Sequence, residues 1–105
     1  MTISDPILAK FRDAVTQIYG ARIERVVLYG SRARGDAKPD SDYDIAVFLE
    51  GMASRFEEIR VITDIELSLR DDGLPHVNAM PYAAGSWRDP SSPLMYEIRK
   101  DGLDL

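Results

Sequence analysis

Two aspartates separated by one residue, Asp42 and Asp44, stand at the head of an apolar segment that ends at Leu49. Side chains at positions i and i+2 of a β-strand point to the same face, so this spacing predicts two carboxylates presented together. Such a pair can hold a hard cation, because Mg²⁺ is bound through one or two carboxylates together with substrate phosphates. Without a cation, the two anions repel each other and resist burial. Taken alone, the pair fits a polar loop that enters a strand, because Asp and Ser are common turn residues. A metal site becomes the favoured interpretation only together with a second motif upstream.

A glycine-serine corner, Gly30 and Ser31, follows an apolar segment that runs from Arg25 to Tyr29. The glycine allows the backbone to approach a ligand closely. If Ser31 opens a helical turn, its hydroxyl and the free N–H groups of that turn suit a phosphate. Arg34 is the better placed of the nearby cations to bind that phosphate, and Arg32 is a weaker candidate. The corner and the aspartates together predict a site for a nucleoside triphosphate with Mg²⁺.

The segment from Tyr29 to Val47 resembles the signature of the polymerase β-like nucleotidyltransferases, and in particular of the minimal nucleotidyltransferases. The resemblance rests on Gly30-Ser31, ten intervening residues and Asp42-x-Asp44. It implies that Gly30 and Ser31 hold the triphosphate, while Asp42 and Asp44 ligate the Mg²⁺ ions and carry catalysis. It also implies in-line attack on the α-phosphate of ATP, with transfer of AMP and loss of pyrophosphate.

The family usually has a third acidic residue on the strand after the long helix, where it ligates the metal and helps to deprotonate the acceptor. The aligned stretch runs from His76 to Met80 and places Asn78 at that position. An amide oxygen is a weak metal ligand, and an amide cannot act as a general base. We expect His76 to share a face with Asn78, where an imidazole could take the proton. A structural or surface histidine is the interpretation we favour.

The resemblance also implies a partner. Minimal nucleotidyltransferases are often encoded beside a small helical protein of the HEPN class, and some are antitoxins that adenylylate it. We therefore expect Mg²⁺-dependent transfer of AMP from ATP to a hydroxyl of a HEPN-type partner, within a homo- or hetero-oligomer. One alternative is a nucleotide-binding antitoxin that acts by contact alone, which Asn78 favours. Another is nucleotide transfer to a small molecule, which the lack of room for a substrate domain disfavours.

Caps and hydrophobic periodicity predict the elements that position these residues. In chain order they are a helix from Ser4 or Asp5 to Gly20, strands at 25–29 and 42–49, a main helix from Ser54 to near Asp71-Asp72-Gly73, a strand at 74–80 and a helix ending at Gly102. Pro75 indicates that the last strand begins there or lies at an edge. This order predicts an α+β fold, a small mixed β-sheet of about three strands packed against helices. The resemblance implies the polymerase β-like nucleotidyltransferase fold.

Composition limits the remaining possibilities. The 105 residues, 45% of them hydrophobic, predict a single domain over residues 1–105. The formal net charge of −5 gives no overall basic field, so direct nucleic-acid binding is not expected. There is no cysteine and one histidine, which excludes thiolate and multi-histidine metal sites. No leader or membrane segment is recognisable, and we expect a cytoplasmic protein without membrane contact.

Three aromatic residues near the C-terminus, Tyr82, Trp87 and Tyr96, admit two interpretations. Aromatic side chains are enriched at protein–protein hot spots, so they could form a partner surface. They could also close the core of this small domain, which is the interpretation we favour.

Overall fold

The computed structural model describes residues 5–70 and 75–105. Its elements are α1 (Pro6–Tyr19), the 3-10 turn η1 (Gly20–Arg22), β1 (Ile23–Tyr29), α2 (Ser31–Arg34), β2 (Tyr43–Leu49), α3 (Arg55–Ser68), β3 (Val77–Ala83), the 3-10 turn η2 (Ser86–Arg88), α4 (Pro93–Asp101) and β4 (Leu103–Asp104). The predictions for Ser4 and for Asp71-Asp72-Gly73 fall outside the described residues. The main helix ends earlier than expected, at Ser68.

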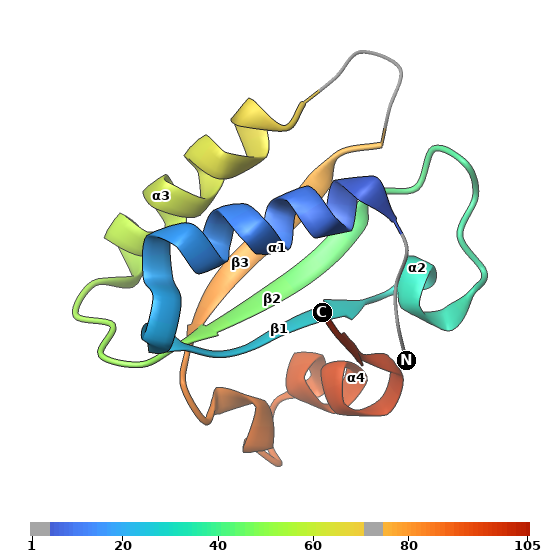
Figure 1. The fold of residues 1–105 in the computed structure, drawn as a ribbon. Coiled ribbons are helices and arrows are strands. Elements are labelled where there is room, and N and C mark those ends of the chain that lie inside the picture. The colour runs from blue at the N-terminus through green and yellow to red at the C-terminus, as the bar shows by residue number, and fades with distance from the viewer. Residues whose placement is uncertain (1–4, 71–74) are drawn as a thin grey trace.

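In the described residues the sheet has four strands in the order β3-β2-β1-β4 (Figure 1). β1 is antiparallel to both β2 and β4, whereas β2 and β3 are parallel. The prediction of an α+β fold with a mixed sheet is therefore confirmed. The expected count of about three strands is wrong by one, because β4 has two residues and is too short to show an alternating pattern.

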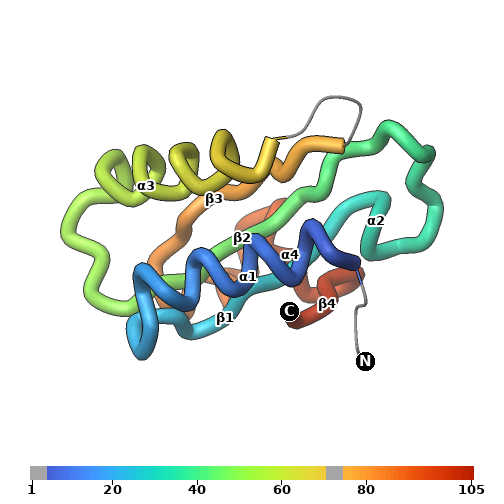
Figure 2. Tube along the Cα trace, turned by 45° about the horizontal axis from the view of Figure 1, so that its top comes forward, coloured from blue at the N-terminus to red at the C-terminus, as the bar shows by residue number. Residues whose placement is uncertain are grey.

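The helices lie on both faces of this sheet (Figures 1 and 2). α1 and α3 cover one face, where their apolar residues pack with alternate residues of β1, β2 and β3. This first core cluster comprises Leu8, Phe11, Val15, Tyr19, Val26, Leu28, Tyr43, Ile45, Val47, Leu49, Ile62, Ile65, Val77 and Ala79. α4 covers the other face, where the second cluster comprises Val27, Ala46, Phe48, Met95 and Ile98. β2 is therefore buried on both sides, as its continuous apolar run predicts.

Local signals explain where the two long helices begin. Asp5 is the N-cap of α1, and its Oδ1 accepts a hydrogen bond from the Ile7 N–H at 2.8 Å. Ser54 is the N-cap of α3, and its Oγ accepts a longer bond from the Glu57 N–H at 3.4 Å. The capping signals seen in the sequence therefore predicted both starts.

β3 is an edge strand that α3 covers with two side chains. The Ala79 N–H donates to Glu66 Oε1 at 2.7 Å, and Arg55 Nε donates to the Pro81 carbonyl at 2.9 Å. The expected edge position is confirmed, although β3 runs later in the chain than predicted and contains Pro81 rather than Pro75. A proline is tolerated here because an edge strand does not need every N–H in the ladder.

The C-terminal aromatic residues divide between core and surface. Tyr82 and Trp87 pack against the second core cluster, and the Trp87 indole N–H donates to Glu24 Oε1 at 2.9 Å. Tyr96 is 55% exposed on α4. The core interpretation therefore holds for two of the three.

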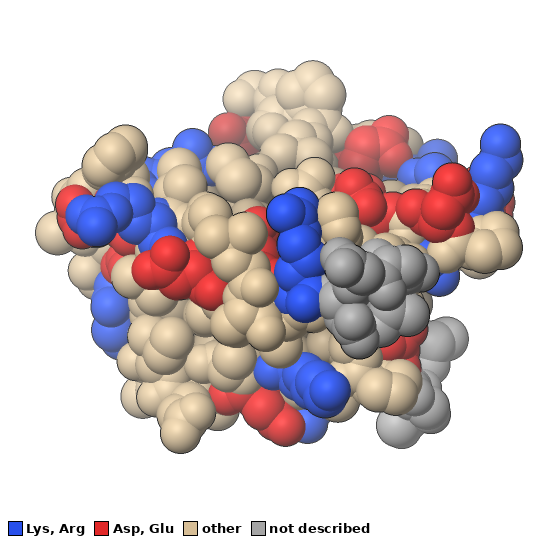
Figure 3. Space-filling model, turned by 90° about the horizontal axis from the view of Figure 1, so that it is seen from above, with Lys and Arg blue, Asp and Glu red and all other residues tan. Residues whose placement is uncertain are grey.

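Positive and negative side chains are interspersed over the face seen from above (Figure 3). Among the described residues of that face, neither sign of charge dominates, so attraction of an anionic ligand depends on local groups. In the part of the chain that the structure describes, no helix has the length and apolar character needed to cross a membrane.

Candidate active site

Three residues lie in one row across the sheet where β1 ends and β2 and β3 begin. Asp44 of β2 pairs with Tyr29 of antiparallel β1 on one side and with Asn78 of parallel β3 on the other. Paired residues on neighbouring strands share a face of the sheet. That face is the one covered by α4, because Ala46, two residues after Asp44, belongs to the second core cluster. Strand register therefore brings together residues separated by up to 49 positions.

Gly30 brings the end of β1 directly against Asp44. Its backbone has φ 75° and ψ −155°, a conformation that is essentially restricted to glycine. A Cβ placed there would lie 2.6 Å from Asp44 Oδ2. α2 begins at the next residue, as expected if Ser31 opens a helical turn, and the Arg34 N–H donates to the Gly30 carbonyl at 3.0 Å. The glycine-serine corner and the carboxylate are therefore immediate neighbours.

Burial and the neighbouring polar and charged residues shift the pKa of Asp44. Burial raises the pKa of Asp44 above its ordinary value of 3.8, and the negative charge of Asp42 raises it further. The Asn78 amide and the Arg34 guanidinium act in the opposite direction and lower the pKa of Asp44. Asp42 itself is exposed just before β2 begins. The structure thus brings Asp42, Arg34 and Asn78 around Asp44.

This donor set suits Mg²⁺. Two carboxylates with an amide oxygen beside them are hard oxygen donors, and Mg²⁺ takes its remaining ligands from water and substrate phosphates. Across residues 5–70 and 75–105, no three side chains of His, Cys, Asp and Glu lie close enough together to hold a metal ion. The candidate site therefore has Asp42 and Asp44 as its carboxylates and Asn78 where a third carboxylate would stand.

The protein-family model of the nucleotidyltransferase domain matches residues 8–86 of the chain. The chain belongs to this nucleotidyltransferase family. The matched span includes the glycine-serine corner, both aspartates and Asn78. The expected family is confirmed, and with it the class of enzyme that the sequence predicts.

Individual relatives agree with this assignment. A protein of Methanocaldococcus jannaschii named as a candidate protein adenylyltransferase is 32% identical over 56 residues, which are 53% of this chain and 57% of that protein. The chain thus aligns with just over half the length of that relative.

Two solved structures are similar in fold. A crystal structure of a toxin–antitoxin with AMP-PNP has a TM-score of 0.62 and 17% identity, covering 97% of this chain and 72% of the other. A candidate nucleotidyltransferase from Sulfolobus solfataricus has a TM-score of 0.58 and 21% identity, covering 93% and 80%. At these identities the likeness shows that the nucleotidyltransferase domain has the fold of these proteins.

Arg34 of the nucleotidyltransferase domain is exposed at the end of α2. Its Nε lies 3.2 Å from Asp36 Oδ2, and a pair this exposed is weak. The guanidinium is therefore free to exchange Asp36 for a phosphate. Arg32 is different, because its donors are already bonded to backbone carbonyls of the loop before β2.

His76 does not lie where the sequence predicts. Its Nδ1 is 3.3 Å from Arg70 Nη2, and the residue lines a small pocket with Ile7 and Glu66 of α1 and α3. These helices cover the face opposite Asn78. The expected common face is wrong because His76 precedes β3, so strand alternation does not yet govern its side chain. The imidazole is therefore not placed to take a proton at the aspartate pair.

Sequence reasoning missed Tyr29 as a site residue. Its half-buried phenol shares the row with Asp44, and burial, then Tyr82, then Asp44 raise the pKa of Tyr29 to about 12. The phenol is therefore protonated at neutral pH and can donate a hydrogen bond into the site. Tyr29 could have been found only from the register in which β1 pairs with β2, and the sequence does not specify that register.

Proposed function

We propose that this domain transfers AMP from ATP, with Mg²⁺, to a hydroxyl group of a partner protein. The observation that carries this proposal is the contact between Gly30 and the Asp44 carboxylate. The contact supports the proposal because the glycine-serine corner then lies beside Asp44, with the charge of Asp42 close by, within the span that matches the nucleotidyltransferase family.

In this proposal each residue has a separate role. Gly30 lets the triphosphate approach the backbone, while the Ser31 hydroxyl and the first N–H groups of α2 bind its oxygens. Arg34 exchanges its exposed partner Asp36 for a phosphate. Asp42 and Asp44 hold the cation, which, when bound, neutralises phosphate charge and orients the α-phosphate for attack.

The group transfer balances as a displacement at phosphorus. A bond forms between the acceptor oxygen and the α-phosphorus, and the bond from that phosphorus to the bridging oxygen of the β-phosphate breaks. Pyrophosphate leaves, and the acceptor proton passes to water, because an amide at Asn78 cannot accept it. The missing base predicts a slow enzyme.

The proposal also specifies ATP as the nucleotide and a protein as the acceptor. One relative is named as a candidate protein adenylyltransferase, and a structure of similar fold is a toxin–antitoxin with AMP-PNP. Both support an adenine nucleotide and a protein partner. We propose a small helical partner of the HEPN class, for which this domain acts as antitoxin.

A second function is favoured by Asn78. The amide faces Asp44 at the position where the third carboxylate would lie. A domain with this substitution could bind nucleotide and Mg²⁺ and neutralise its partner through contact alone. The two functions differ in whether the partner becomes covalently modified.

The deciding experiment incubates the purified domain with ATP labelled at the α-phosphate, Mg²⁺ and the product of the neighbouring gene. Label on the partner, lost in the Asp42→Asn variant, supports AMP transfer. Asp40→Asn is the control, because Asp40 is an exposed aspartate of the loop before β2. Neutralisation of the partner without label supports the contact-only function. Failure of Mg²⁺ and ATP together to raise the melting temperature contradicts both.

A further inference from the structure

Arg32 follows the phosphate-binding corner, but its guanidinium is bonded to the loop that leads into β2. Its Nε and Nη2 donate to the Ser41 carbonyl at 3.1 and 2.8 Å, and Nη2 also donates to the Pro39 carbonyl at 3.1 Å. Asp42 is the next residue after Ser41. The Arg32 side chain, which comes from α2, therefore fixes the backbone next to the candidate metal ligand Asp42.

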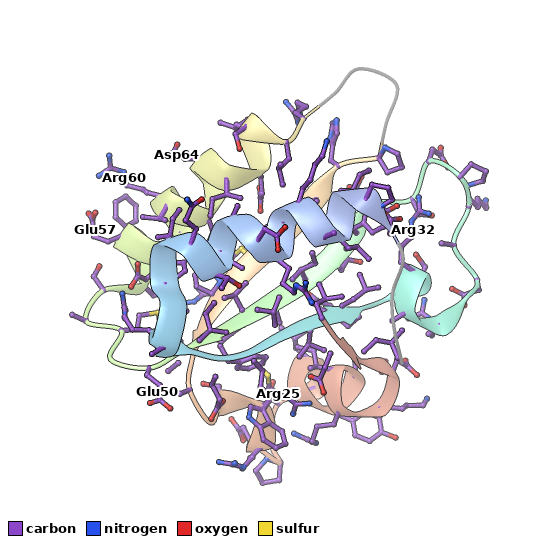
Figure 4. The ribbon with its side chains drawn as sticks, in the orientation of Figure 1. Arg25, Arg32, Glu50, Glu57, Arg60 and Asp64 are labelled. Atoms are coloured by element: carbon purple, nitrogen blue, oxygen red, sulfur yellow. The ribbon has the colours of Figure 1, made fainter. Side chains whose placement is uncertain are left out.

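The same guanidinium also stacks on a side chain between the two aspartates. The Arg32 Cζ lies 4.5 Å from the centre of the Tyr43 ring. Tyr43 is buried in the first core cluster, and its hydroxyl donates to Asp5 Oδ2 at the start of α1. Figure 4 shows Arg32 between the start of α1 and the loop before β2. Arg32 therefore connects α2, this loop and the first residue of β2.

These contacts lie on the face of the sheet opposite the candidate active site. The Tyr43 side chain points to the face covered by α1 and α3, whereas Asp44 points to the face covered by α4. Arg32 packs on the Tyr43 side and uses its donors on carbonyl groups. Arg32 therefore supports the site from the opposite face of the sheet, and its donors are not directed at the triphosphate.

The backbone of Asp42 is held on both sides. Arg32 binds the carbonyl of Ser41 before it, and the Tyr43 N–H after it donates to the His76 carbonyl at 2.9 Å. A planar guanidinium can bind two carbonyls and stack on a ring at once, whereas a lysine ammonium is a point charge that cannot reproduce this geometry. The position therefore requires arginine and not merely a positive charge.

We propose that Arg32 is a positioning residue that holds Asp42 at the distance from Ser31 needed to bind a magnesium–nucleoside triphosphate complex. The inference rests on the proposed function, since it concerns the same site. It predicts that Arg32 contributes to the metal-dependent part of nucleotide binding and not to direct phosphate contact.

Titration calorimetry with AMP-PNP, with and without Mg²⁺, tests this proposal on the wild-type domain, Arg32→Ala and Arg32→Lys. Loss of a residue that orients metal ligands costs about 10–100-fold in affinity. We expect a loss of that size with Mg²⁺ in Arg32→Ala, only partial recovery in Arg32→Lys, and unchanged affinity without Mg²⁺. The control is Arg60→Ala, because Arg60 is exposed on α3 and reaches Glu57 at 3.6 Å (Figure 4).

The outcomes separate this proposal from the proposed function. Wild-type protein that does not bind AMP-PNP with Mg²⁺ contradicts the proposed function, and with it this inference. Wild-type binding with equal losses in Arg32→Ala with and without Mg²⁺ means that Arg32 contacts phosphate, which overturns the positioning role alone. Unchanged binding in both Arg32 variants overturns it as well. Thermal unfolding checks that each variant is folded. If Arg32→Ala does not fold, the binding comparison is made with Arg32→Lys alone.

Discussion

A Cβ at Gly30 would come within 2.6 Å of Asp44 Oδ2, so the absence of a side chain at the end of β1 makes room for a carboxylate on β2. The atom that would clash is the far end of the Asp44 side chain and not backbone. A methyl group at Gly30 would therefore rotate the carboxylate away at little energetic cost. What would be lost is the direction in which Asp44 points.

The Gly30→Ala substitution should therefore abolish binding of Mg²⁺ with nucleotide while costing only moderate stability. Alanine at φ 75° introduces backbone strain of about 1–3 kcal/mol. Gly20→Ala is the matched control, because Gly20 has φ 55° and ψ −124° and no neighbour within 4 Å of an added Cβ. Urea unfolding should give similar losses of free energy for both variants, whereas calorimetry should show lost binding for Gly30→Ala alone. Normal binding by Gly30→Ala would contradict the proposed site.

The Asp44→Asn substitution should stabilise the metal-free protein at neutral pH while removing Mg²⁺ binding. Burial and the charge of Asp42 both disfavour ionised Asp44. The gain should be at most about 1 kcal/mol, because the group is only partly withdrawn from solvent. Urea unfolding in EDTA measures it, and Asp40→Asn, in the exposed loop, should show no such gain. A destabilised Asp44→Asn variant would contradict the expected cost of the carboxylate pair.

The sign of the pH dependence follows from the same raised pKa. The folded protein binds the Asp44 proton more tightly than the unfolded chain does, because its folded-state pKa lies above 3.8. That contribution to stability is present below pH 3.8 and is lost as the pH rises through the raised pKa. The advantage of Asp44→Asn over wild type should therefore shrink toward pH 3.8, and Mg²⁺ affinity should fall over the same range. An advantage that grows on acidification would contradict the direction of the pKa shift.

Hydrophobic periodicity predicts the two long helices, but some of their apolar residues lie outside the buried face. Successive steps of three residues fall about 60° short of a full turn, so a run spaced by threes drifts around the helix. Phe56 and Ile65 are nine residues apart and lie on opposite sides of α3, which leaves Phe56 69% exposed. On α1, Tyr19 is buried, whereas the neighbouring Ile18 is 54% exposed. A list of apolar residues indicates a helix but does not fix its buried face.

The local parts of the candidate site were predictable, and the long-range parts were not. The glycine-serine turn, with α2 beginning at Ser31, depends on neighbouring residues, whose geometry follows from residue type. The places of Tyr29 and His76 depend on strand register and on where β3 begins. The packing of whole elements decides those properties, so the sequence pattern alone did not predict them.

Two phenylalanines test the assignment of the core. Phe48 is fully buried on β2 between the sheet and α4, whereas Phe56 lies exposed in the first turn of α3. Phe48→Ala should lower the free energy of unfolding by about 3–5 kcal/mol, because it leaves a cavity in the core. Phe56→Ala should change it by less than about 0.5 kcal/mol. Urea unfolding of both variants measures the difference, and equal losses would contradict the placement of α3 or α4.

The Asn78→Asp substitution tests what the amide costs this nucleotidyltransferase domain. Asn78 pairs with Asp44 in the parallel register of β2 and β3, so a carboxylate there would join the two aspartates in one anionic cluster. In EDTA the added charge should destabilise the fold by about 0.5–1 kcal/mol and raise the pKa of Asp44 further. Saturating Mg²⁺ should reverse this loss, because a third carboxylate is a better ligand than an amide oxygen, and affinity for Mg²⁺ should rise about tenfold, or about 1.4 kcal/mol.

The same substitution also has a catalytic consequence. If the domain transfers AMP slowly without a base, the carboxylate of Asn78→Asp should accept the acceptor's proton, and label on the partner should increase by about 10²–10⁴-fold. Asn78→Ala is the control, since it removes the amide without adding charge and should show neither the gain in Mg²⁺ affinity nor the gain in rate. An Asn78→Asp variant that Mg²⁺ stabilises no more than wild type would show that residue 78 does not face the bound cation.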